Sequence, residues 1–200
     1  MPVKPSLSEP ELLLRELNHR VKNNFQVITS LMNVKKRHMA PEGREAIRFL
    51  EEHVLSMSVS FRLGYGGQHM LEISLSELIT EVLSGLRQLG DLAEERLKID
   101  TTGVNVAIDL DQAIALALYM ATAAPPYLEA ARDRRGGVVH VRLLQDAARV
   151  TLIIQGNTTE QPPPDVLRQR LVRGYAGQLQ AKVLPTEEFA GQSIAFDLLA

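Results

Sequence analysis

The chain has 200 residues, 45% apolar and 23% charged, which is typical of a globular protein with one large domain or two small ones. A formal charge of −2 gives no electrostatic basis for binding nucleic acid or an anionic membrane surface, and the absence of cysteine excludes disulfides, thiolate metal sites and a cysteine nucleophile. No apolar run reaches the roughly 18 residues that span a bilayer, and residues 1–8 look like a disordered lead without a signal peptide's apolar core, so we expect a cytoplasmic protein.

Residues 9–38 are predicted to form a long amphipathic helix. One stripe of apolar residues recurs at spacings of three and four along it: Leu14, Leu17, Val21, Ile28 and Leu31. His19 points away from this stripe, on a polar face that it shares with Glu16, Asn23, Gln26 and Ser30. A histidine held in solvent by a rigid helix can offer a ring nitrogen to a reacting group. The alternative is a solvated surface histidine without a role.

A second helix is predicted at residues 44–63, after a turn near Pro41 and Gly43. It repeats the same spacing with its own stripe: Ile47, Leu50, Val54, Met57 and Phe61. One antiparallel hairpin cannot bury a stripe on each helix. We therefore expect a homodimer whose two hairpins, residues 9–66 of each chain, form a four-helix bundle.

Residues 67–200 are predicted to form an α+β domain. The glycines at 64, 66 and 67 mark the boundary, and Ser74 or Ser76 can cap a helix that ends near Gly90. Further helices are expected at residues 110–124 and through 167–175, and strands at 97–100, 104–108, 138–144, 148–154, 179–184 and 192–198. Helices laid over one face of a mixed sheet give an α+β sandwich.

The helix around His19 resembles a known phosphoacceptor box. Residues 13–28, which read LLRELNHRVKNNFQVI, are similar to the second dimerisation family of histidine kinases (HisKA_2, related to the HWE kinases). In that family the histidine of the His-Arg pair is phosphorylated, which implies His19 as the acceptor. The remaining histidines match no such position and are expected to be ordinary surface or linker residues: His38, His53, His69 and His140.

The order of elements after residue 67 resembles the GHKL (Bergerat) ATP-binding domain of histidine kinases, in a degenerate form. Compared with the family pattern, Tyr119 stands in place of a glutamate and Ala123 in place of the asparagine that helps to hold magnesium. Gln155 replaces the aspartate that reads adenine, and Asn157 replaces a glycine. The glycine-rich lid is missing as well. We expect no ATP binding, although a poor alignment that hides a working site is the alternative.

These features predict a dimeric histidine phosphotransferase of a phosphorelay, which moves a phosphoryl group between receiver-domain aspartates through phospho-His19. Glu16 is expected to orient the His19 ring, and the supporting or receiver-contacting residues are Arg20, Lys22, Asn23 and Gln26. No metal or cofactor is expected on this chain, because the response-regulator receiver supplies Mg²⁺. The alternatives are a phosphatase of a regulator, as in the general stress response, an active kinase, or a non-catalytic docking scaffold.

Overall fold

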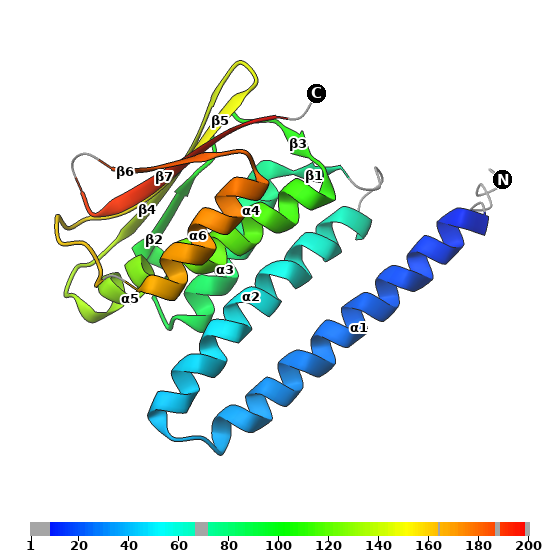
Figure 1. Cartoon of the computed structure of the whole chain (residues 1–200), viewed down its shortest axis with the longest axis horizontal. Coiled ribbons are helices and arrows are strands. Elements are labelled where there is room, and N and C mark those ends of the chain that lie inside the picture. Colours follow the sequence, from blue (N-terminus) through cyan, green and yellow to red (C-terminus); the bar gives the residue numbers. More distant parts are fainter. Residues whose placement is uncertain (1–8, 67–71, 164, 187–188, 199–200) are drawn as a thin grey trace.

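The computed structural model describes residues 9–66, 72–163, 165–186 and 189–198, without the side chains of residues 9–15, 17, 18, 42 and 66. The expected disordered lead (residues 1–8) and His69 lie outside this range. Two long antiparallel helices, α1 (Glu9–Arg37) and α2 (Pro41–Gly66), form a hairpin beside an α/β domain (Figure 1). None of the described helices is both long and apolar enough to cross a bilayer.

The turn between α1 and α2 is tighter than the sequence predicts. Pro41 and Gly43 were expected to lie in the turn, but α2 already begins at Pro41. Proline suits the first helical position, because its missing N–H group would have no intrahelical partner there and its φ angle is already helical. Residues 38–40 therefore make the whole connection, and the backbone N–H of His38 bonds to the carbonyl of Lys35 at 3.0 Å.

The face of α1 that packs on α2 differs from the predicted stripe. Phe25 contacts Phe61 of α2 with ring centroids 5.7 Å apart, Met32 is buried, and Lys36 Nζ donates to Glu51 Oε2 at 2.6 Å. Ile28 and Leu31, which belong to the predicted stripe, are exposed to solvent instead. The helix thus has two apolar sides, one against α2 and one that is exposed in the single chain.

The α/β domain contains a five-stranded mixed sheet in the order β2-β4-β5-β7-β6. Its strands are β2 (Leu97–Asp100), β4 (Val139–Asp146), β5 (Arg149–Gly156), β6 (Lys182–Pro185) and β7 (Gly191–Asp197). β2 runs parallel to β4, and the other neighbours are antiparallel. Two short strands, β1 (Ile73–Ser74) and β3 (Ala107–Ile108), pair separately, so the strand predicted at 104–108 is shorter than expected.

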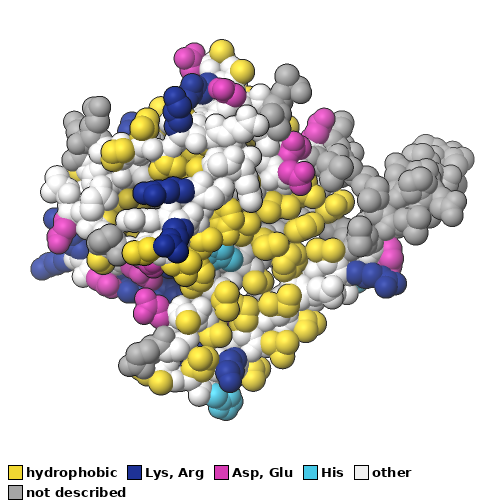
Figure 2. Space-filling view, viewed as in Figure 1, with side chains coloured by type: hydrophobic (Ala, Val, Ile, Leu, Met, Phe, Trp, Pro, Cys, Tyr) yellow, Lys and Arg dark blue, Asp and Glu magenta, His cyan; other side chains and the backbone are white. Residues whose placement is uncertain are grey.

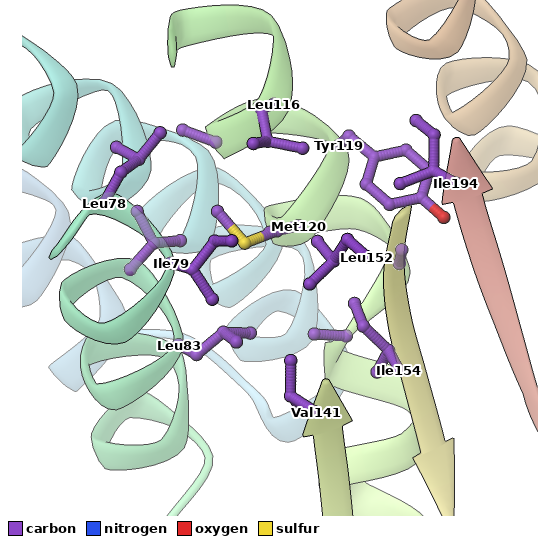
Figure 3. Packing of buried hydrophobic residues seen from close by; sticks show 14 of the residues in the cluster. Leu78, Ile79, Leu83, Leu116, Tyr119, Met120, Val141, Leu152, Ile154 and Ile194 are labelled. Atoms are coloured by element: carbon purple, nitrogen blue, oxygen red, sulfur yellow. The ribbon is translucent and has the colours of Figure 1, made fainter. Parts of the chain in front are cut away.

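Helices cover one face of the sheet, as predicted (Figure 1). They are α3 (Leu75–Leu89), α4 (Leu110–Ala123), α5 (Pro125–Asp133) and α6 (Val166–Gln178), with a 3-10 turn, η1, at Glu94–Arg96. Figure 3 shows the core between Ile79 and Met120 of the helices and Leu152 of the sheet. The sequence predicted no α5. Pro125 and Pro126 do end α4, but they also occupy the first positions of a new helix.

α2 belongs to the hairpin and to the α/β core at the same time. Val59 lies in the main apolar cluster, and the buried hydroxyl of Ser60 is 3.3 Å from the carbonyl oxygen of Ala113 in α4. At Gly85 of α3, an added Cβ would lie 2.7 Å from Cδ2 of Leu55, so α2 and α3 pack at short range there. A displacement of α2 would therefore be felt in both parts of the chain.

Candidate functional site: an exposed histidine, a buried ion pair and a cavity

His19 lies exposed near the middle of α1, as the polar face of the helix predicts. Its Nδ1 atom is 3.2 Å from Nδ2 of Asn23, one helical turn further on. An asparagine amide serves either tautomer of the ring, since its nitrogen donates to a bare Nδ1 and its oxygen, after a flip, accepts from Nδ1–H. In the second arrangement, the lone pair of Nε2 is available for a reacting group in solvent.

Glu16 does not orient His19, which corrects the prediction. Its Oε1 atom instead accepts a hydrogen bond from Arg20 Nε at 2.9 Å, and both side chains are exposed. The residue that contacts the His19 ring is Asn23. Lys22 and Gln26 are exposed on the same helix without a described contact to His19. The structure therefore brings together His19 and Asn23, and separately Glu16 and Arg20.

An apolar surface adjoins the His19 face of α1. Val27, Leu31 and Val34 are 57%, 64% and 56% exposed, and they line a shallow groove together with Asn23, Gln26 and Ser30. Figure 2 shows hydrophobic side chains gathered along the hairpin in this view. We call Val27, Leu31 and Val34 the apolar flank of α1. Exposed aliphatic residues at this spacing are typical of a helix–helix interface.

A buried ion pair joins α2 to α6. Glu52 Oε2 is 3.3 Å from Arg168 Nη2, and Glu52 Oε1 is 3.7 Å from Arg48 Nε. The Arg168 guanidinium also lies 5.1 Å from the ring centroid of Phe49 and donates to the carbonyl oxygen of Thr122 at 3.3 Å. Burial raises the pKa of Glu52 to about 7, although the two arginines oppose the shift.

His53 extends this cluster and is not the ordinary surface residue that the sequence suggests. Its Nδ1–H donates to the carbonyl oxygen of Phe49 at 2.8 Å, and Nε2 lies 3.2 Å from the hydroxyl of Thr122 in α4. Burial lowers its pKa, so the ring is held neutral between helices. His38 and His140 are exposed, as expected. The adjacent glutamates at positions 51 and 52 are a sequence feature that could have drawn attention to this part of α2, but they do not indicate its partners on α4 and α6.

Replacing Glu52 by glutamine should remove part of the pH dependence of stability. The raised pKa means that the folded protein keeps a proton that the unfolded chain releases between about pH 4.5 and 7, so stability falls as pH rises through this window. Glutamine imitates the protonated acid and should abolish that loss, which amounts to up to about 3 kcal/mol. Urea unfolding of both proteins at about pH 5 and 8 measures the difference.

The matched control for this prediction is Glu45→Gln, at an exposed position of the same helix. Other groups titrate in all three proteins, so the comparison between variants isolates Glu52. If Glu52→Gln and the unaltered protein lost equal stability between the two pH values, the raised pKa of Glu52 would be wrong.

A cavity of about 810 Å³ opens beside α6. Arg168 and Thr122, which belong to the buried cluster, both line it, and so does Ala123. The other positions that depart from the ATP-binding pattern have structural contacts. Tyr119 is fully buried beside Leu152 and Ile194 (Figure 3), and its hydroxyl has no hydrogen-bond partner among the described residues.

Asn157 also has a structural contact. Its side chain bonds to the backbone of Val138 and Gly136 at 3.0 and 2.9 Å, which holds the segment that leads into β4. Gln155 is half-buried in β5, next to Gly191, where an added Cβ would lie 2.6 Å from Cβ of Gln155. The sequence identified both positions as departures from the family pattern, but their contacts become visible only in the structure.

The N-terminal part of the chain is similar to a known family of proteins. Residues 16–89 match the family model HisKA_2, described as "Histidine kinase". The chain is 27% identical over 155 residues to the sensor histidine kinase PdtaS of Mycobacterium tuberculosis, in a match that covers 74% of this chain and 30% of PdtaS. It therefore spans less than a third of the curated relatives that it matches.

Two solved structures share the fold. One is the histidine kinase domain of the blue-light activated histidine kinase of Erythrobacter litoralis EL346, at 18% identity and a TM-score of 0.60, with 94% of this chain and 91% of that domain covered. The other is a structure of that blue-light activated kinase itself, with a TM-score of 0.61 at 18% identity, covering 99% of this chain and 62% of the other. Both support a helical N-terminal region followed by an α/β domain with a mixed sheet.

Proposed function

We propose that this chain, whose residues 16–89 match the HisKA_2 family model, is a histidine phosphotransferase of a two-component phosphorelay. The observation that carries the proposal is the exposed His19, with a ring nitrogen directed to Asn23 on a rigid helix. Response-regulator receiver domains are its partners. We place this reaction in the cytoplasm, where receiver domains are found.

The proposed reaction is a phosphoryl transfer in two steps. The lone pair of His19 Nε2 attacks the phosphorus of an aspartyl phosphate, the bond from phosphorus to the aspartate oxygen breaks, and the carboxylate leaves. The phosphohistidine then gives its phosphoryl group to a second receiver's aspartate by the reverse exchange. The structure places Asn23 Nδ2 against His19 Nδ1. With the amide flipped, Asn23 Oδ1 would accept from Nδ1–H, so that Nε2 presents its lone pair. Mg²⁺ comes with the receiver's acidic pocket.

The residues around His19 have supporting roles in this proposal. Arg20 is held in place by Glu16 and carries a positive charge beside the phosphoryl group. Lys22 and Gln26 are exposed on the same helix and contact the receiver. The apolar flank of α1 pairs with a second copy, which gives a homodimeric four-helix bundle with two His19 sites.

The cavity beside α6 supports a protein without autokinase activity, because its residues fit magnesium-bound ATP poorly. Ala123 offers a methyl group where a hard cation needs oxygen. Asp165, the one carboxylate among the described lining residues, already accepts bonds from the backbone N–H groups of Leu167 and Arg168 and pairs with the Arg168 side chain. In the described part of the chain, no group of three metal-binding side chains is present.

A second candidate function is that of an active histidine kinase. The similarity to PdtaS and to the blue-light activated kinase is equally consistent with it. The observation that favours it is the cavity itself, whose volume of about 810 Å³ is sufficient for a nucleotide. The phosphatase and the docking scaffold use the same exposed face of α1, so the structure favours neither over the phosphotransferase.

Mixing the purified protein with a receiver domain that carries a labelled phosphoryl group tests the proposal. The expected result is label on this chain without added nucleotide, followed by transfer to a second receiver. Loss of receiver label without uptake would identify a phosphatase. Uptake from γ-labelled ATP with Mg²⁺, together with a micromolar dissociation constant for the nucleotide, would identify a kinase. Binding of the receiver without loss or uptake of label would identify a scaffold.

A further inference from the structure

The cavity beside α6 has the size of a small-molecule site. It lies between α6 and strands β6 and β7 on one side and the junction of α4 and α5 on the other, and its volume of about 810 Å³ is within the range of ligand pockets. Pockets that bind organic ligands combine apolar walls with a few polar groups that fix the orientation.

Most of the cavity wall is apolar. It is built from four prolines and several aliphatic side chains, among them Pro126, Pro162, Pro185, Val172 and Val183. Arg168 and Arg173 are its positively charged residues, and Asp165 is the one carboxylate among its described lining residues. Because Asp165 already caps α6 and pairs with Arg168, the charge that remains for an occupant is a small positive one. One anionic group matches this charge better than the several negative charges of a triphosphate.

We propose that this cavity binds a small organic molecule with an apolar body and a single anionic group, and that Arg168 is the partner of the anion. Arg168 lines the cavity and also pairs with the buried Glu52 of α2. The proposal goes beyond the phosphotransfer function and does not depend on it.

An occupant would compete with Glu52 for Arg168. Arg168 connects three helices, through the Glu52 carboxylate and the Phe49 ring of α2, through the Thr122 carbonyl of α4, and through its own position on α6. Drawing the guanidinium into the cavity weakens the contact between α2 and α6. Since α2 packs directly on α1, the effect reaches the helix that carries His19.

Two glycines of α6 provide a matched pair of variants for testing the site. Gly177 lines the cavity and Gly174 does not, yet a Cβ added at either one meets no atom within 4 Å. Leucine at both positions removes the same backbone freedom from the same helix. Gly177→Leu should fill the cavity, whereas Gly174→Leu should leave it open.

The probe is 8-anilinonaphthalene-1-sulfonate, which has an apolar body and one sulfonate, titrated into the full chain and followed by its fluorescence. Gly177→Leu should weaken binding at least tenfold, and Gly174→Leu should leave it unchanged. At about pH 8, where Glu52 is ionised, Glu52→Gln should tighten binding several-fold, because it removes the negative charge that competes for Arg168. Leu31→Asp should not weaken it, since Leu31 lies on the exposed flank of α1.

Equal affinity of the Gly177→Leu and Gly174→Leu proteins would overturn the proposal, and so would a loss of binding in Leu31→Asp. Displacement of the probe by micromolar Mg²⁺-ATP would overturn the assignment of a single anionic group. The two proposals are tested separately, because receiver phosphorylation by the same variants measures the phosphotransfer function. Negative results with the probe leave that assay untouched.

Discussion

Replacing His19 by glutamine should abolish uptake of label from a phosphorylated receiver domain while leaving the fold intact. Glutamine keeps a polar, uncharged side chain but has no nitrogen lone pair that can attack phosphorus. The described contact of the His19 ring is one exposed hydrogen bond to Asn23, so the free energy of unfolding should change by no more than about 0.5 kcal/mol. Quantification of label on the chain and urea unfolding measure the two effects.

His38→Gln and His140→Gln are the controls, because both histidines are exposed and lie outside the phosphoacceptor box. Both variants should accept label at the normal rate. The label on the unaltered protein should be lost in acid and retained in base, as a phosphoramidate is. If the His19→Gln protein took up label at the normal rate, the proposed phosphorelay function would be wrong.

The same variant separates a transferase from a phosphatase. If His19→Gln takes up no label but still accelerates loss of phosphate from the receiver, His19 is not the nucleophile of that reaction. The exposed face of α1 would then position a water molecule, and the phosphatase would replace the phosphotransferase. If both activities disappear together, the phosphohistidine lies on the pathway of each.

Local sequence patterns were sufficient to predict most elements of the fold. The apolar spacing over residues 75–86 predicts five residues on the buried face of α3, and all lie in the core: Leu75, Leu78, Ile79, Val82 and Leu86. Leu83 is buried as well, although the spacing did not single it out. Ser74 caps this helix by accepting from the backbone N–H of Glu77. Such features depend on neighbours within a turn or two, which is the range that periodicity reports.

The missed features depend on contacts between distant segments. Glu52 and Arg168 are 116 positions apart, and His53 meets Thr122 across 69 positions, so no spacing rule brings them together. The cavity likewise needs α6 to lie against β6 and β7. The polar face of α1 was predictable because His19 and Asn23 are four residues apart, but the choice of Asn23 over Glu16 as partner depends on rotamers.

Replacing Leu31 by aspartate should dissociate the homodimer that we propose. Leu31 is 64% exposed in the single chain and sits at the centre of the apolar flank, between Val27 and Val34. In a symmetric bundle it would be buried, so an aspartate there would place an unpaired charge in the interface of both chains. Each buried charge costs several kcal/mol, and two-fold symmetry applies that cost twice. Light scattering of the eluting protein measures the mass.

Asn33→Asp is the matched control, because Asn33 is exposed on the same helix two positions away and therefore lies near its opposite side. It adds the same charge and should leave the dimer intact. Ile28→Asp should weaken the dimer as well, since Ile28 borders the flank and is partly exposed in the single chain. If the unaltered protein had the mass of a monomer, the proposed dimeric bundle would be wrong. The apolar flank of α1 would then be a surface for the receiver, next to His19.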